Sequence, residues 1–351
     1  MKNFIYDQAG IRVRFGAGAL GHLKEEVAGL GATRAIVFST PEQQSDAEGA
    51  LARLETLGAG TFSGAVMHVP VDTVAAALET VDRLKADCSV AIGGGSTIGL
   101  AKAVALERGL PILAVPTTYA GSEMTPIWGL TEGGLKKTGR DRKVLPRTVI
   151  YDPTLTVTMP ARLSGTSGMN AMAHCVEGLY AENANPIMTL FAAEGIRALG
   201  RSLPIVVHDP QNIEARSDAQ YGAWLSGAVL GNVGMAIHHK LCHTLGGSFN
   251  LPHAEVHTVV LPHAVAYNRD AAPDAMAIAA EALGVEDAAR GLYDLAGRLD
   301  APIALRDIGM PADGLDRAAE LATENPYYNP RPIKRDAIRK LLDDAFHGRR
   351  P

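Results

Sequence analysis

Histidines are concentrated in one segment of the chain, because residues 238–263 contain six of the 11 histidines and few other polar side chains. His239 and His243 are four residues apart in an apolar helical pattern, so they share one helix face, and His253 follows ten residues later. Paired histidines are typical of metal sites and of proton transfer, whereas a lone histidine in an apolar helix is usually a packed core residue. We therefore interpret His239, His243 and His253 together as functional residues.

A second helical pattern carries three polar side chains on one face. Asn170, His174 and Glu177 have i, i+4 and i+7 spacing within the apolar segment Gly168–Tyr180.

A glycine-rich segment, Ala91–Thr97, joins an apolar run to a helical run at Ile98–Leu106. Three glycines let the backbone turn sharply, and their N–H groups with the helix N-terminus form an anion site suited to a pyrophosphate. The alternative is an ordinary capped turn, and the segment lacks the G-x-G-x-x-G fingerprint of the common dinucleotide fold. The expected cofactor contacts are Gly93, Gly94, Gly95 and Ser96.

Two further apolar runs end in hydroxyl side chains. Thr117, Thr118 and Ser122 follow the run Pro111–Val115, and ligands bind at such ends of a parallel sheet. Ser39 and Thr40 follow another run, where an acidic residue would bind the ribose of NAD and repel the 2′-phosphate of NADP. Because Ser39 and Thr40 do neither, we expect the protein to accept both NADH and NADPH.

The elements that must position these residues divide the chain into two predicted domains. Over residues 1–158, β-branched runs alternate with helical patterns, which predicts an α/β domain with a parallel, Rossmann-like sheet. Its expected strands are Arg34–Phe38, Cys88–Ile92, Pro111–Val115 and Thr148–Tyr151, with helices at Ser45–Leu57 and Val74–Lys85.

Residues 159–351 show helical spacing, which predicts an all-α domain and a boundary near Pro160. The expected helices are Gly168–Tyr180, Thr189–Ala198, Asp218–Gly231, Ile237–Leu245, Asp274–Leu283, Ala288–Leu299, Leu315–Thr323 and Lys334–Phe346. We expect the active site in the cleft between the two domains.

The composition is that of a globular protein with large cores, since 47% of the residues are hydrophobic. The net charge is −5, and no run of Lys and Arg forms a stripe that would bind nucleic acid or a membrane surface. No apolar run reaches the ~18 residues of a membrane span, and no signal-peptide pattern is visible at the start. Because the three cysteines are widely spaced and suggest no disulfide framework, we expect a cytoplasmic protein.

The combined pattern resembles the iron-containing alcohol dehydrogenase superfamily, whose fold is similar to that of dehydroquinate synthase. The matching stretches are Gly93–Ser96, Pro116–Thr118, Tyr151–Pro153, Gly168-x-x-Ala171-x-x-His174-x-x-Glu177 and His239-x-x-x-His243-x-x-Gly246. The resemblance implies a nucleotide-binding α/β domain, a helical domain and a homodimer. It also implies that the positions of the metal ligands are Asn170, His174, His239 and His253, with His243 beside the ion.

Asn170 departs from the metal-dependent members, which have a carboxylate at that position. This departure, and the stretches Thr117–Pro126, Thr138–Asp141, Leu145–Pro153 and Asn329–Ile333, resemble the maleylacetate reductase branch of the superfamily. That resemblance implies reduction of the C=C bond of maleylacetate to 3-oxoadipate by NADH or NADPH, without a metal, in the breakdown of aromatic compounds.

Such a reaction needs hydrogen-bond donors for a developing enolate oxygen and an acid that protonates carbon. We expect His243 to be the donor or acid, with His239, His253 and His174 shaping the pocket. The candidate partners of the substrate carboxylates are Lys136, Lys240 and Arg331, and Asn170 is a further candidate substrate-binding residue. The alternative interpretation of Lys136, Lys240 and Arg331 is that they are solvated surface charges.

Three other functions stay open from the sequence. A metal-dependent alcohol or polyol dehydrogenase would have the same fold and cofactor but would need an ion. A lyase similar to dehydroquinate synthase would use NAD without net redox change and would need more phosphate-binding cations. A non-catalytic nucleotide-binding module would bind the cofactor without turnover.

Overall fold

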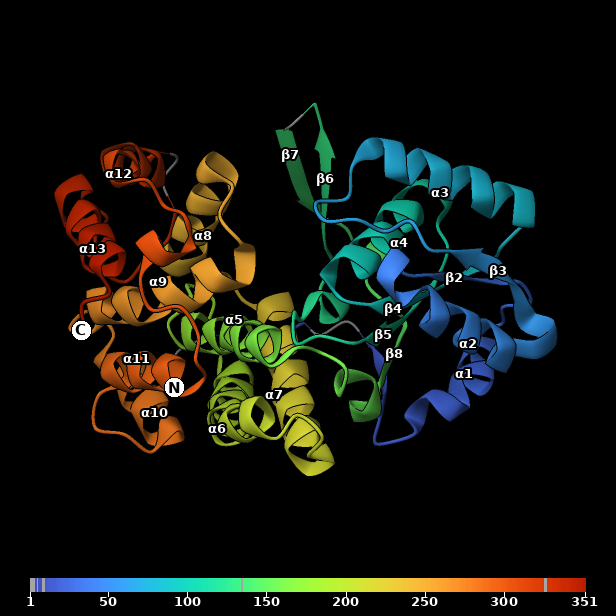
Figure 1. Cartoon of the computed structure of the whole chain (residues 1–351), viewed down its shortest axis with the longest axis horizontal. Coiled ribbons are helices and arrows are strands. Elements are labelled where there is room, and N and C mark those ends of the chain that lie inside the picture. The colour runs from blue at the N-terminus through green and yellow to red at the C-terminus, as the bar shows by residue number, and fades with distance from the viewer. Residues whose placement is uncertain (1–3, 5, 8–9, 134, 325–326) are drawn as a thin grey trace. The chain divides into compact units, whose positions relative to one another are not determined.

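The computed structural model describes residues 4, 6–7, 10–133, 135–324 and 327–351. They form two compact units, the first within Gln8–Thr158 and the second within Met159–Pro351 together with the described part of Met1–Asp7 (Figure 1). Each unit has a buried hydrophobic cluster of its own.

The described residues of the first unit contain a six-stranded parallel sheet in the order β1-β8-β5-β4-β2-β3. Its strands are β1 (Arg12–Phe15), β2 (Ala35–Phe38), β3 (Gly58–Phe62), β4 (Cys88–Gly93), β5 (Ile112–Pro116) and β8 (Thr148–Tyr151). The helices of this unit are α1 (Leu23–Gly29), α2 (Gln44–Leu54), α3 (Val71–Leu84) and α4 (Gly95–Arg108). The predicted α/β fold with a parallel sheet is therefore confirmed.

Local pattern alone does not predict β1 or β3. β1 alternates arginine with hydrophobic residues at the edge of the sheet, and β3 contains two glycines and no fully buried position. An antiparallel hairpin of β6 (Ile127–Glu132) and β7 (Leu135–Arg140) is a further addition to the predicted elements. Lys136 lies in β7, but its side chain is outside the described part of the structure.

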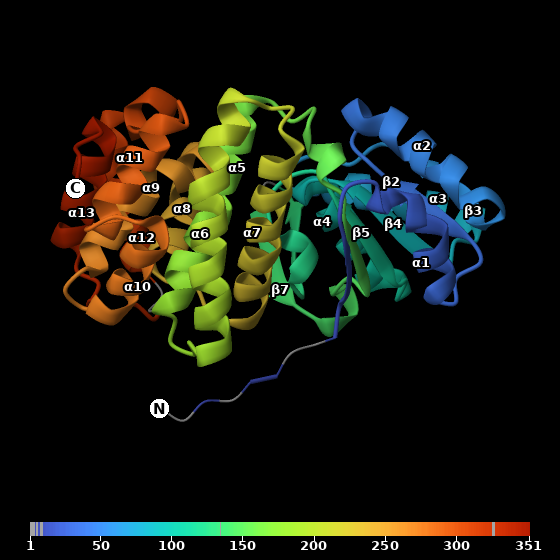
Figure 2. The ribbon, with the colours of Figure 1, turned by 90° about the horizontal axis from the view of Figure 1, so that it is seen from below.

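The regular elements described in the second unit are all helical, which confirms the predicted all-α class. They are α5 (Ala161–Leu179), α6 (Pro186–His208), α7 (Ile213–Asn232), α8 (Ile237–Phe249), α9 (His253–Asn268), α10 (Pro273–Leu283), α11 (Ala288–Arg298), α12 (Leu315–Thr323) and α13 (Arg335–His347). Helices α5, α6 and α7 lie side by side (Figure 2). The sequence does not predict α9, because Pro262 interrupts its helical pattern.

Helix α5 is buried along almost its whole length and carries the predicted face of Asn170, His174 and Glu177. Glycines let the neighbouring helices approach it closely. A Cβ atom at Gly168 would lie 2.3 Å from a methyl carbon of Leu203, and one at Gly178 would lie 2.2 Å from Val229. The polar face of α5 is therefore fixed by close helix packing.

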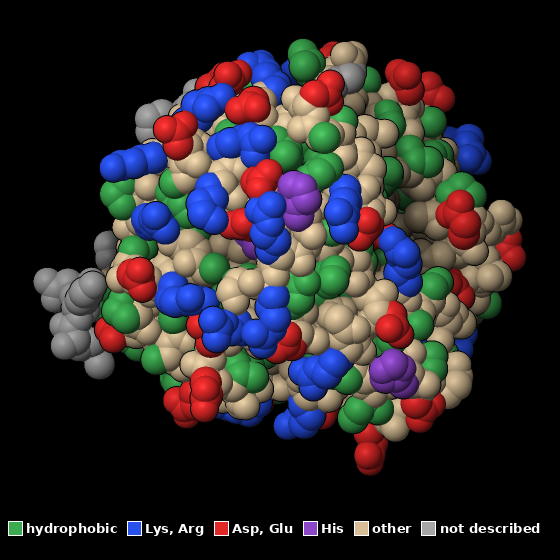
Figure 3. Space-filling view, turned by 60° about the vertical axis from the view of Figure 1, so that its left-hand side comes forward, with side chains coloured by type: hydrophobic (Ala, Val, Ile, Leu, Met, Phe, Trp, Pro, Cys, Tyr) green, Lys and Arg blue, Asp and Glu red, His purple; other side chains and the backbone are tan. Residues whose placement is uncertain are grey.

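Basic and acidic side chains are interspersed on the face of the molecule that Figure 3 shows. Some of the charged side chains of the second unit form ion pairs, such as Arg335 with Asp316 and Arg349 with Asp343. None of the described helices is both long enough and apolar enough to cross a membrane.

Candidate active site

The glycine-rich loop connects the end of β4 to the start of α4. Gly93 has a φ angle of +151°, and a Cβ atom there would lie 2.4 Å from Oγ1 of Thr97. Gly95, which is exposed, begins α4, and the nearest atom to a Cβ at that position would be 3.9 Å away. The N-cap residue of this 14-residue helix, Gly94, makes no side-chain cap hydrogen bond to its first N–H groups. That arrangement fits a phosphate group.

The loop after β5, which carries Thr117, Thr118 and Ser122 and is called the hydroxyl loop below, packs directly against the glycine-rich loop. The backbone N–H of Thr117 donates to the carbonyl oxygen of Gly93 at 3.1 Å, and its Oγ1 accepts from Gln43 at 3.0 Å. A Cβ at Gly94 would lie 3.0 Å from Thr118. The structure therefore brings together two of the loops that the sequence predicts to contact a cofactor.

Ser39 and Thr40 follow β2, as predicted, but they differ in accessibility. Ser39 is buried, and its hydroxyl lies 2.9 Å from that of Ser63 and donates to the carbonyl oxygen of Thr40 at 3.0 Å. Thr40 is half-buried. Of the two, Thr40 is the side chain that a ribose or a 2′-phosphate can reach.

Sequence reasoning missed Lys102, a fully buried lysine on α4. Its Nζ donates to the carbonyl oxygens of Ser122, Thr125 and Ile127 at 2.6 to 2.8 Å, and to Oγ1 of Thr125 at 3.0 Å. Burial lowers the pKa of Lys102 to about 7, although the carboxylate of Glu123 opposes this shift. Lys102 ties the end of the hydroxyl loop to the helix that begins at the glycine-rich loop.

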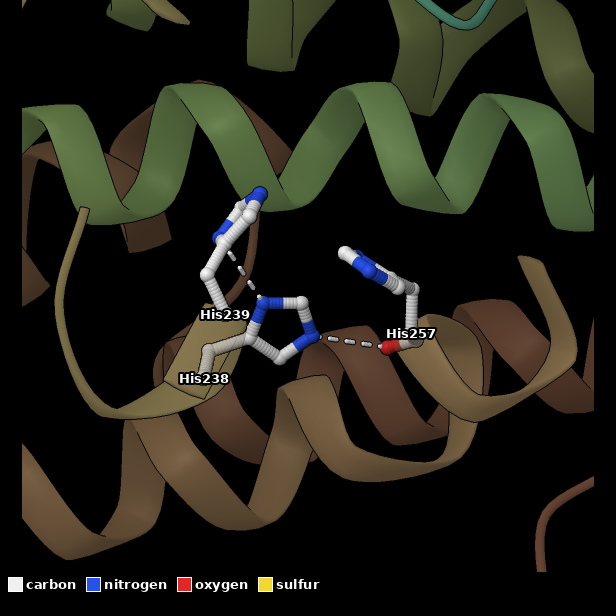
Figure 4. A group of neighbouring side chains, drawn as sticks. All are labelled: His238, His239 and His257. Atoms are coloured by element: carbon white, nitrogen blue, oxygen red, sulfur yellow. Dashed lines mark hydrogen bonds between the residues drawn. The ribbon is translucent and has the colours of Figure 1, made fainter. Parts of the chain in front are cut away.

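The second unit assembles the histidine cluster from three helices. The ring centroids of His174 (α5) and His239 (α8) are 5.0 Å apart, and His257 (α9) lies 5.0 Å from His239. His243 is 6.2 Å from His239, and His253 is 4.3 Å from His257. Figure 4 shows His238, His239 and His257 turned toward one another beside α5.

The cluster has a buried part and an exposed part. His174, His238, His239 and His257 are at most 7% exposed, whereas His243 and His253 are exposed. Burial lowers the pKa of His174, His239 and His257 well below the ordinary value, and that of His238 to about 4. The four buried rings are therefore neutral near pH 7.

Glu177 fixes the orientation of His239. Its carboxylate accepts from the Nδ1–H of His239 at 2.6 Å, and from the backbone N–H groups of Ala236, His238 and His239 at 2.8 to 3.3 Å. The carboxylate thereby satisfies the N-terminus of α8. Because the neutral ring carries its proton on Nδ1, the Nε2 atom of His239 can only accept a hydrogen bond.

Several buried polar atoms of the cluster have no hydrogen-bond partner among the described residues. They are Oδ1 of Asn170, Nδ1 of His174, Nε2 of His239 and both ring nitrogens of His257. Unpaired buried groups cost about 1–3 kcal/mol each, so a native site usually supplies a ligand or water for them. This concentration of unpaired atoms makes the cluster a candidate binding site.

The residues present fit a tightly bound divalent ion poorly. Imidazole nitrogens suit zinc and iron, and a carboxylate behind a ligating histidine is a common support in metal sites. At the four matched positions, however, every donor is neutral, since Asn170 offers an amide oxygen. The Glu177 carboxylate is engaged with α8. Burying a double positive charge without an anionic ligand would cost several kcal/mol.

The remaining predicted cations lie near tyrosines of the second unit. Lys240 is half-buried, and its Nζ is 5.6 Å from the ring centroid of Tyr327. Arg331 stacks over the ring of Tyr267 at 4.3 Å and donates to the carbonyl oxygen of Tyr267 at 3.1 Å. Lys240 therefore stays available for a substrate, whereas Arg331 holds its own segment against α9.

The fold, the glycine-rich loop and the hydroxyl loop are those of an iron-containing alcohol dehydrogenase. The model of that family matches residues 11–153, and the model of its C-terminal domain matches residues 164–346. The chain belongs to this family and is an oxidoreductase. The resemblance read from the sequence motifs is thus confirmed.

The similar proteins point to one branch of the family. The chain is 58% identical to a maleylacetate reductase of Burkholderia cepacia over 100% of both chains, and 56% identical to one of Sphingobium indicum over 99% of both. The crystal structure of maleylacetate reductase from Agrobacterium tumefaciens superposes with a TM-score of 0.98, at 53% identity and 100% coverage of both chains.

Proposed function

We propose that the protein is a maleylacetate reductase, which reduces the C=C bond of maleylacetate to give 3-oxoadipate. The observation that carries this proposal is its full-length similarity to enzymes of that name, at 50–58% identity. Each unit offers a group that the reaction requires: the first has an anion-binding loop for a dinucleotide, and the second has a histidine cluster.

The nicotinamide cofactor, NADH or NADPH, supplies the hydride. Gly93, Gly94, Gly95 and Ser96 would hold its pyrophosphate at the start of α4, and Thr117, Thr118 and Ser122 would contact it from the neighbouring loop. These residues fit the cofactor because no side chain caps the N-terminus of α4. Thr40 carries no charge, so neither form of the ribose is repelled.

The exposed histidines supply the proton. Negative charge develops on the ketone oxygen of maleylacetate as the C=C bond is reduced, and a hydrogen-bond donor must stabilise that oxygen. The buried His239 accepts rather than donates at Nε2, because Glu177 holds its proton on Nδ1. We therefore assign donation and protonation to His243, while His253, Asn170 and His174 shape the pocket and Asn170 binds substrate polar groups.

This assignment includes no step that requires a metal. The enolate oxygen is stabilised by N–H donors of the chain, so the missing carboxylate ligand at Asn170 is tolerated. Maleylacetate carries two carboxylates, and Lys136 and Lys240 are the cations that we assign to them.

The deciding experiment follows NADH oxidation by absorbance after maleylacetate is added to enzyme dialysed against a chelator. We expect one NADH to be consumed per maleylacetate without added metal. His243→Ala should lower kcat about 10²- to 10⁴-fold, the range of general acid catalysis. The control, His208→Ala, removes an exposed histidine at the end of α6 and should leave kcat unchanged. Turnover that returns only with a divalent ion would assign the enzyme to the metal-dependent dehydrogenases.

We also propose a cytoplasmic homodimer. Cys88, Cys175 and Cys242 are buried and unpaired, as expected in a reducing compartment. Burial raises the pKa of Cys88 and Cys175 to about 12, so neither is a reactive thiolate. Sedimentation velocity tests the dimer, and a single species of monomer mass would contradict it.

A further inference from the structure

Tyr327, which follows α12, carries a hydroxyl group that neither the sequence motifs nor the mechanism uses. Its oxygen is buried and has no hydrogen-bond partner among the described residues. The ring packs against the hydrophobic cluster of α8, α9, α12 and α13. A buried phenol hydroxyl without a hydrogen bond costs about 1–3 kcal/mol of stability. The packing of the ring does not need this hydroxyl, so a ligand is the partner that would offset its cost.

Lys240 places a positive charge over the ring that carries this hydroxyl. Its Nζ is 5.6 Å from the ring centroid of Tyr327, and the residue lies on α8 between His239 and His243. No carboxylate of the described residues lies within ion-pair distance of Lys240, although most of the other charged side chains of the second unit are paired. A half-buried ammonium without an anionic partner is suited to an anionic ligand.

The hydroxyl of Tyr327 stays protonated at working pH. Burial raises its pKa, and the negative charge of Glu177 raises it further. Tyr327 is therefore a hydrogen-bond donor, and the lysine that lies over its ring is next to His239 on α8.

We propose that the Tyr327 hydroxyl and the Lys240 ammonium together bind one carboxylate of the substrate, and so select dicarboxylates over monocarboxylates. This inference rests on the proposed function and adds a specificity-determining residue to it. The ring fixes the position of the hydroxyl, whereas the flexible lysine supplies the charge. A ligand without the second carboxylate would leave both groups buried without an anion, which is how polar sites reject analogues.

The test compares Tyr327→Phe with Tyr328→Phe. Each variant loses one phenol oxygen, but Tyr328 is 40% exposed and serves as the matched control. A hydrogen bond to a charged group contributes about 1.5–3 kcal/mol, so Tyr327→Phe should raise KM for maleylacetate about 10- to 100-fold. We expect kcat and KM for NADH to change less than twofold, and Tyr328→Phe to behave as the unchanged enzyme.

An increase in KM of less than twofold in Tyr327→Phe, or an equal increase in Tyr328→Phe, would overturn the proposal. A fall in kcat with unchanged KM would also overturn it, because the hydroxyl would then act on the reacting atoms instead of holding a carboxylate.

A binding measurement separates this inference from the proposed function. Adipate and hexanoate, a dicarboxylate and a monocarboxylate of six carbons, are titrated into the NADH-bound enzyme and followed by NADH fluorescence. Adipate should bind at least tenfold more tightly than hexanoate, and Tyr327→Phe should abolish the difference. If maleylacetate is not reduced but adipate binding depends on Tyr327, the proposed function fails and the carboxylate site stands. Equal binding of the two acids overturns the site.

Discussion

Replacing Glu177 by glutamine tests whether this carboxylate sets the protonation of His239. The substitution preserves size and changes only the charge and one acceptor. In the structure Oε2 of Glu177 accepts from Nδ1 of His239 at 2.6 Å and from the N–H of Ala236 at 3.1 Å, while Oε1 accepts from the N–H of His238 at 2.8 Å. An amide has a single acceptor oxygen, so at least one of these donors must face its NH₂ group.

The expected loss of stability is about 2–4 kcal/mol. One unpaired buried donor costs about 1–3 kcal/mol, and the remaining hydrogen bonds lose the roughly 1 kcal/mol that a charged acceptor adds. Relief of the buried charge offsets part of this loss, because burial raises the pKa of Glu177. Where the NH₂ group faces Nδ1 of His239, that nitrogen becomes the acceptor and the proton moves to Nε2. We expect kcat/KM to fall about 10- to 100-fold, as for other residues that orient a site histidine.

Urea unfolding gives the stability, steady-state oxidation of NADH with maleylacetate gives kcat/KM, and ¹⁵N NMR of the imidazoles reports the tautomer of His239. Glu255→Gln is the control, since it neutralises a carboxylate that pairs with the exposed Arg162 and should cost less than about 1 kcal/mol. If Glu177→Gln destabilised the protein but left kcat/KM and the His239 tautomer unchanged, Glu177 would be only a helix cap and our reasoning would be refuted.

Three further predictions concern the cofactor loops, the metal and the acid stability. Lys102→Met removes the donor that joins Ser122, Thr125 and Ile127, so the free energy of unfolding should fall by about 2–4 kcal/mol. The KM for NADH should rise about tenfold while kcat stays nearly constant. An unchanged KM would show that the hydroxyl loop keeps its shape without the lysine. Asn170→Asp supplies the missing anionic ligand, so calorimetry should detect Zn²⁺ binding at least tenfold tighter than in the unchanged enzyme, and equal affinity would contradict our account of the donor set. Burial lowers the pKa of His263 to about 4, below the unfolded value near 6.5. The contribution of neutral His263 to the free energy of unfolding is therefore complete above pH 6.5. As the pH falls toward 4, this contribution, on the order of 3 kcal/mol, is lost. Since glutamine does not titrate, His263→Gln should show a shallower loss of stability over that range in urea titrations, and parallel curves would exclude His263 as the cause.

The sequence predicts those parts of the fold that follow from local pattern. The buried strands β2, β4, β5 and β8 are mostly apolar, and the spacing of His174, His239 and His243 follows from the helical repeat. β1 and β3 are not predictable in this way, because neighbouring strands rather than their own hydrophobicity stabilise them.

The contacts that support the candidate site are the least predictable. Lys102 reaches acceptors 20 to 25 residues away, and Glu177 reaches donors 59 to 62 residues away. Nothing in the sequence near Tyr327 distinguishes it from Tyr328, although one hydroxyl is buried and the other tyrosine is exposed. The exposure of His243 and His253, as opposed to the burial of His239 and His257, likewise depends on how α5, α8 and α9 pack.

The close approach of α5 to its neighbours limits which substitutions this enzyme can tolerate. Gly168 and Gly178 touch no reactant, yet any side chain there would displace the helix that carries Asn170, His174 and Glu177. A mutagenesis library aimed at new substrates should therefore keep both glycines and vary the accessible residues around Lys240. Among natural variants, a change at Gly178 should be accompanied by a smaller residue at Val229, because the two positions share one volume.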